Sequence, residues 1–165
     1  VGIKIYPRST QRDVFRRRIL AGQTVMSAWA GMDNALVTSD MEPDALAPTS
    51  SAQFQWPRWG QFVETNGKEG ERPALPTANH LVRLYEEWRV SSTRDQRRAI
   101  WRKMLTINAE QLFTIGVINS TLQPIVVSNE LRNVPEKGLY SFEPGAFIGR
   151  YMPDAFWFDR AETKA

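Results

Sequence analysis

The first 31 residues carry the pattern that most limits the fold, a strand, a helix and a second strand in close succession. Residues 2–6 alternate in polarity, and residues 25–29 form a second β-prone run. An apolar helix face lies between them, made by Val14, Phe15 and Ile19 and closed by Gly22. This spacing is typical of a right-handed parallel crossover. We therefore predict an α/β domain in which the two strands are parallel neighbours in a mixed sheet with flanking helices.

Residues 32–76 have a different character, because prolines and glycines interrupt them throughout. Long regular elements are therefore not expected there. Three of the six tryptophans, Trp29, Trp56 and Trp59, nevertheless lie in or beside this stretch. Because an aromatic-rich irregular stretch of this length is usually functional, we expect it to be ordered and to contribute to a binding surface. Its exposed tip is expected at residues 66–72.

The second half of the chain opens with two helical patterns. Apolar residues recur at helical spacing from Leu81 to Trp88, and a capping box of Thr93 and Gln96 begins a further helix. This helix is expected to run to about Phe113. Residues 113–118 and 124–127 have the composition of strands joined by a turn, and the chain beyond them is rich in loop-forming residues.

The composition argues against several classes of chemistry. The chain has no cysteine and a single histidine, His80, and it lacks the glycine-rich phosphate-binding and nucleophile motifs. We therefore expect no metal, no cofactor and no enzymatic activity. A group of acidic residues offers acid–base chemistry as an alternative, but turn and cap positions account for it better. Its members are Asp33, Asp40, Glu42 and Asp44.

The charge of the chain is mild, with a formal net value of +3. Basic residues gather in two helical stretches, 8–18 and 94–103. We interpret these as solvated helix faces, because no nucleic-acid-recognition motif accompanies them. No apolar run approaches the roughly 20 residues that a membrane span needs. We therefore expect neither a nucleic-acid partner nor a direct membrane span.

Several strings of the sequence resemble the family 5 extracellular solute-binding proteins, the dipeptide, oligopeptide and nickel binders that serve ABC importers. The likeness covers about residues 2–159 and is greatest to the large-ligand branch, whose members take peptides, oligosaccharides or opine-like compounds. The most specific string is 128–135 (SNELRNVP). The others are 28–34 (AWAGMDN), 46–50 (LAPTS), 55–61 (QWPRWGQ), 100–105 (IWRKML), 114–117 (TIGV), 124–127 (PIVV) and 153–158 (PDAFWF).

The resemblance implies the second lobe of a periplasmic-binding-protein-like, type II fold, truncated in this chain. Residues 1–127 would form a partial second-lobe α/β domain. Residues 128–165 would be a C-terminal segment that returns to a first lobe outside this chain. The location implied is periplasmic, with the signal peptide outside this fragment.

The function implied is reversible binding of a peptide, oligosaccharide or opine-like solute between two lobes, with an ABC-transporter permease as partner. The alternative is a protein-interaction or chaperone-like domain that uses an exposed aromatic surface. A hydrolase built on carboxylates is the weakest of the three hypotheses.

Six residues are candidates for the ligand-binding site: Trp29, Met32, Asp33, Asn34, Trp56 and Trp59. The first four follow a predicted strand, at the end where α/β sheets bind ligands. Indole rings offer flat apolar walls, and short polar side chains can hold an ammonium or hydroxyl group. Four of them also have a structural alternative: core packing for Trp29, a turn for Asn34, and anchoring of the loop at Pro57 for the other two tryptophans.

Overall fold

The computed structural model describes residues 2, 4–32, 37–118, 122, 124–138 and 152–159. The chain divides into two compact units, and each is described by itself. Unit 1 comprises Val1–Trp29 and Glu42–Thr114, and unit 2 comprises Ala30–Met41 and Ile115–Ala165. Within the described ranges, no helix is long and apolar enough to cross a membrane.

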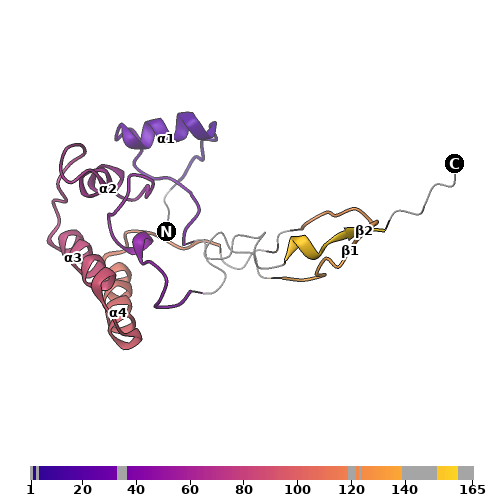
Figure 1. Ribbon diagram of the computed structural model, residues 1–165. Helices are drawn as coiled ribbons and strands as arrows, with labels where there is room; N and C mark the ends of the chain where they lie inside the picture. Colours follow the sequence, from indigo (N-terminus) through magenta and orange to yellow (C-terminus); the bar gives the residue numbers. More distant parts are fainter. Residues whose placement is uncertain are drawn as a thin grey trace. The chain divides into compact units, whose positions relative to one another are not determined.

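Unit 1 is helical in its described part. Its elements are α1 (Arg12–Leu20), the short 3-10 helix η1 (Asp44–Leu46), α2 (Pro57–Glu64), α3 (Pro76–Val90) and α4 (Arg94–Gln111). Helices α3 and α4 form a hairpin and lie side by side (Figure 1). The connection between them, 91–93, is short, as is typical of antiparallel helix neighbours.

The core of unit 1 lies between this helical hairpin and the loop around η1. Leu81 and Leu84 of α3 and Met104 of α4 are fully buried, and Pro43 and Pro48 close the core from the loop. Burying one Leu or Met side chain stabilises the folded state by roughly 1.5–3 kcal/mol. The apolar stripe predicted from Leu81 onward is therefore confirmed as the side of α3 that faces the core.

The helix ends follow local rules that the sequence displays. Thr93 Oγ1 accepts a hydrogen bond from the Gln96 backbone N–H at 3.3 Å, and Gln96 Oε1 accepts one from Thr93 N–H at 3.3 Å. This is the predicted capping box. Leu112 then ends α4 in the left-handed region, with φ of 52°. Gly22, with φ of +67°, closes α1 as expected, because glycine adopts this conformation without steric cost.

The strand predictions for residues 2–6 and 25–29 are wrong. Described residues in both segments have no strand pairing, so the expected parallel pair is not formed. Ile5, Tyr6 and Met26 are exposed, and Val25 is wholly exposed. The physical reason is that a parallel pair is stable only inside a sheet covered on both faces, and the sheet of the described chain consists of the two strands at 131–132 and 157–158. The described residues of 113–118 and 124–127 are likewise unpaired, contrary to prediction.

Unit 2 holds a short antiparallel ladder. Strand β1 (Leu131–Arg132) pairs with β2 (Trp157–Phe158), with Leu131 opposite Phe158. The 3-10 helix η2 (Pro153–Ala155) directly precedes β2. The ladder joins two strings that carry the family resemblance, 128–135 and 153–158, although they are far apart in sequence.

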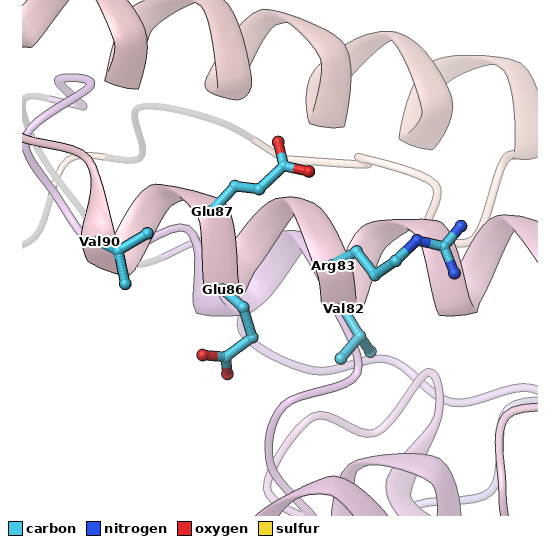
Figure 2. A pocket seen from close by; sticks show the side chains of 5 residues that line it. All are labelled: Val82, Arg83, Glu86, Glu87 and Val90. Carbon is cyan, nitrogen blue, oxygen red and sulfur yellow. The ribbon is translucent and has the colours of Figure 1, made fainter.

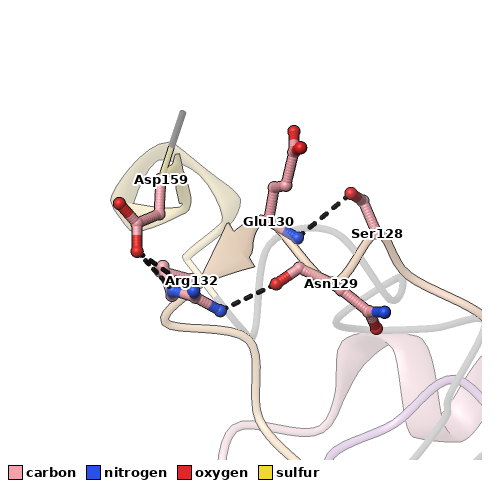
Figure 3. A network of polar contacts seen from close by, with 5 residues as sticks. All are labelled: Ser128, Asn129, Glu130, Arg132 and Asp159. Atoms are coloured by element: carbon pink, nitrogen blue, oxygen red, sulfur yellow. Dashed lines mark hydrogen bonds and ion pairs between the residues drawn. The ribbon is translucent and has the colours of Figure 1, made fainter. Parts of the chain in front are cut away.

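A polar network reinforces this ladder (Figure 3). Arg132 donates from Nε and Nη2 to Asp159 Oδ2 at 3.1 and 3.0 Å, and from Nη1 to the Asn129 carbonyl at 2.7 Å. Ser128 Oγ accepts from the Glu130 backbone N–H at 3.2 Å. Both members of the ion pair are about half exposed, so its contribution to stability is about 0–1 kcal/mol.

The predicted domain boundary at residue 127 stays a prediction. The predicted first domain ended at residue 127, whereas residues 30–41 and 115–127 group with the C-terminal segment. The expected α/β second-lobe fold, truncated in this chain, remains a prediction, as does the return of residues 128–165 to another lobe.

Candidate functional site

Three aromatic rings of unit 1 form a cluster, which we call the aromatic platform: Phe15, Trp29 and Phe54. Phe15 stacks on Trp29 with ring centroids 5.3 Å apart and planes 21° apart. Phe54 meets Trp29 at 4.8 Å and Phe15 at 5.6 Å. Such aromatic pairs contribute about 0.5–1.5 kcal/mol each beyond the area they bury. The contacts hold Trp29 in place while 47% of its surface remains exposed.

A guanidinium accompanies the platform. Arg12 CZ lies 5.6 Å from the centroid of the Trp29 ring, within the range of a cation–π interaction. Arg12 and Phe15 are three residues apart on α1, so both side chains fall on the same side of that helix. Among the residues that the structure describes, no carboxylate forms an ion pair with Arg12. The platform therefore offers a flat apolar surface beside a positive charge.

The loop that carries Phe54 is organised by its neighbour Gln53. Gln53 Oε1 accepts from the backbone N–H groups of Thr49 and Ser50, at 3.1 and 3.3 Å, and from Trp56 Nε1 at 3.0 Å. Its Nε2 donates to the Asp44 carbonyl and to Thr49 Oγ1. One amide side chain thus joins η1, the loop and the start of α2, and this places Phe54 against α1.

Helix α2 holds the other side of this loop at close range. A Cβ on Gly60 would overlap the carbonyl oxygen of Ser50, so only glycine permits this approach. The Ser51 backbone N–H donates to Glu64 Oε2 at 3.0 Å. Burial raises the pKa of Glu64, but hydrogen bonds from Ser51 and Ser50 outweigh it, so the pKa of this carboxyl lies below its usual value.

The structure places Trp56 in the core, against its prediction as a ligand wall. Only 4% of its surface is exposed, and its ring packs edge-on against Phe113 with centroids 4.9 Å apart. The reason is the hydrogen bond from its indole N–H to Gln53, which satisfies the polar end and lets the ring be buried. The alternative of loop anchoring at Pro57 describes Trp56 correctly.

The remaining candidates lie in other parts of the chain. Trp59 lies in α2 and is partly buried. Met32 is partly buried and belongs to unit 2, whereas Trp29 belongs to unit 1. Asp33 and Asn34 lie outside the described residues. Trp29 lies on the platform, and its partners Arg12, Phe15 and Phe54 were not predicted.

The described carboxylates near residues 40–44 have structural positions or partners. Asp40 lies in a turn, and Asp44 Oδ1 accepts from the Ala45 backbone N–H at 2.8 Å at the start of η1. Glu42 accepts a hydrogen bond from the Tyr85 hydroxyl. Burial and this bond to Glu42 raise the pKa of Tyr85. The position of Asp40 agrees with the turn interpretation, whereas Glu42 bonds to a residue of α3 that is distant in sequence. Within the described ranges, no group of three or more His, Cys, Asp or Glu residues is arranged to hold a metal ion.

A shallow depression lies on α3 and shares no residue with the aromatic platform (Figure 2). Its lining comes from a single helix and consists of Val82, Arg83, Glu86, Glu87 and Val90. Figure 2 shows these side chains spread along the helix surface without converging on one point. Glu86 is paired with Arg89 at 3.1 Å. An open surface of this kind offers a solute little enclosure, so we do not take it as the functional site.

The chain was compared with known proteins at three levels. No protein-family model, no curated protein and no solved structure matches it.

Proposed function

We propose that this chain belongs to the substrate-binding component of an ABC importer and reversibly binds a peptide, oligosaccharide or opine-like solute without making or breaking a bond. The proposal combines the sequence resemblance with one structural observation, the half-exposed Trp29 held between Phe15 and Phe54. On this proposal the protein works outside the cytoplasm and delivers its solute to a permease. On this proposal the first lobe would supply the opposing wall of the site.

The platform suits such a solute for a physical reason. A rigid indole presents a large apolar area and loses little conformational entropy on binding, because its neighbours already hold it. Sugar rings and the side chains of peptides have flat or apolar faces that can lie against it. The nearby guanidinium adds a polar contact that can orient the solute.

The test is a titration of the full-length protein with tripeptides, maltotriose and octopine, followed by tryptophan fluorescence and calorimetry. We expect one class of solute to bind and Trp29→Ala to weaken that binding at least tenfold, which corresponds to about 1.4 kcal/mol. Trp88→Phe, on α3 and outside the platform, is the matched control and should leave affinity unchanged. Absence of binding by all three classes would refute the proposal.

A second candidate function is a protein-interaction or chaperone-like domain. It is favoured by the exposed apolar residues of unit 2, which include Val117, Leu122 and Val126. Exposed apolar surface of this extent commonly marks a protein partner. Such a domain would bind an unfolded client protein, such as reduced carboxymethylated lactalbumin, and would not respond to any of the small solutes.

A further inference from the structure

We propose that the solute carries a carboxylate group, which Arg12 binds while an apolar part of the solute lies on Trp29. This inference rests on the proposed function and narrows it, because it favours peptides and opine-like compounds over neutral oligosaccharides. It assigns a binding role to a residue of α1 that sequence patterns place only on a solvated helix face.

The first argument is charge. Residues 8–20 contain five arginines, at positions 8, 12, 16, 17 and 18, against one acidic residue, Asp13. No carboxylate of the described chain neutralises Arg12. The positive potential beside the platform is therefore available to an anionic solute, and it attracts such a solute before contact is made.

The second argument is geometry. The cation–π contact with Trp29 restrains the guanidinium of Arg12. Its central carbon lies 5.6 Å from the centroid of the Trp29 ring. A guanidinium has five N–H donors in one plane, and this fork matches the two oxygens of a carboxylate. A restrained fork loses less side-chain freedom on binding than a free one. The arrangement therefore suits a ligand whose carboxylate is adjacent to an aromatic or aliphatic group.

The third argument is the position of Arg12 relative to Phe15. One helical turn separates them, so α1 presents the charge and the ring on the same face. Phe54 bounds the platform from the loop that Gln53 organises. A solute that contacts the exposed part of Trp29 can thus reach Arg12 without any rearrangement of the helix.

The experiment compares acid and neutral probes on the full-length protein by calorimetry. The probes are a tripeptide library with free C-terminal carboxylates, the same library with C-terminal amides, octopine and maltotriose. We expect the strongest binding from a carboxylate-bearing probe. Arg12→Gln should weaken it about 10- to 100-fold, as expected for loss of a charge-assisted hydrogen bond. Arg12→Lys, which keeps the charge without the fork, should lose less.

Arg17→Gln is the matched control, because it removes the same charge from the other side of α1. It should change affinity less than twofold, and circular dichroism should show the same helix content in all variants. Strongest binding by maltotriose, equal binding of the acid and amide libraries, or no effect of Arg12→Gln would each overturn the carboxylate inference and leave the proposed function standing. Inorganic phosphate that competes as well as a carboxylate probe would also overturn it. Failure of every probe to bind would refute both proposals.

Discussion

The two units of this chain contrast in how their apolar residues are used. In unit 1, apolar positions at helical spacing are buried, and Leu81, Leu84 and Met104 form a core. In unit 2, none of the described residues is buried, although residues 115–127 are rich in isoleucine and valine. A helix completes its own backbone hydrogen bonds and needs only one covered face. A β-prone segment needs a partner strand for its backbone and a second layer for its side chains, so composition alone does not bury it.

The largest effect is expected in the core of unit 1. Leu81→Ala should lower the free energy of unfolding by about 2–5 kcal/mol, because the side chain is fully buried and its removal leaves a cavity. Urea unfolding followed by circular dichroism at 222 nm measures this change. Leu105→Ala on α4, where the leucine is half exposed, is the control and should cost less than about 1 kcal/mol. Equal losses would contradict the placement of the core.

Replacing a glycine by alanine is expected to affect stability differently in the two units. Gly60→Ala should destabilise the fold by about 1–3 kcal/mol, because the new Cβ would overlap the Ser50 carbonyl and force α2 away from the loop. Gly116→Ala in unit 2 meets no atom within 4 Å and should change stability by less than about 0.5 kcal/mol. Thermal unfolding of both variants is the measurement. A smaller effect at Gly60 than at Gly116 would show that α2 does not depend on this close approach.

Local capping should have an intermediate effect. Thr93→Ala removes the side-chain acceptor at the start of α4 and should cost about 1 kcal/mol. Ser92→Ala changes the adjacent exposed residue and serves as the control, with an expected change below about 0.5 kcal/mol. Denaturant midpoints of the two variants can be compared directly. Indistinguishable midpoints would mean that tertiary packing holds the α4 end without its cap.

The smallest effect is expected in the ladder of unit 2. Asp159→Asn should weaken the pairing of β1 with β2 by at most about 1 kcal/mol, because the ion pair with Arg132 is half exposed. Hydrogen exchange of the backbone amide of residue 159 reports on this locally, because the N–H of Asp159 donates to the Glu130 carbonyl at 2.8 Å. Glu136→Gln removes a nearby exposed charge as a control. The unfolding of unit 1 should not respond to either change.

Sequence patterns predicted the three longest helices and missed α2 and η1. The stripe from Leu81, the Thr93 cap and the Gly22 stop are local signals, and the structure confirms them. Helix α2 was missed because its prolines and glycines suggested an irregular segment, although Pro57 at the first helical position is a favourable start. Its Gly60 is needed for close packing against Ser50, which no periodicity reveals.

The ligand-binding role of the six candidate residues stays a prediction. Trp29 was expected at a binding surface and is half exposed on the platform. Arg12 and Phe15 were missed as its partners because they precede it in a separate helix, and Phe54 because it follows in a separate loop. The three-residue spacing of Arg12 and Phe15 was the available signal, since it places both on one side of α1. The spacing did not show that this side of α1 packs against Trp29.

The amino-acid sequence by itself determined where helices α1, α3 and α4 form and end, because their hydrogen bonds, caps and apolar spacing are all local. Tertiary structure decided which tryptophan is buried and which stays exposed: Gln53 satisfies the indole N–H of Trp56 and permits its burial, whereas Trp29 rests on Phe15 and Phe54 with nearly half its surface free. It also decided that the β-prone segments at 2–6 and 25–29 remain unpaired in the described chain. The physical reasons differ. Gln53, three residues away, satisfies the indole N–H of Trp56, but the distant Phe113 covers its ring. An extended segment forms a strand only when a distant segment supplies its backbone hydrogen-bond partners.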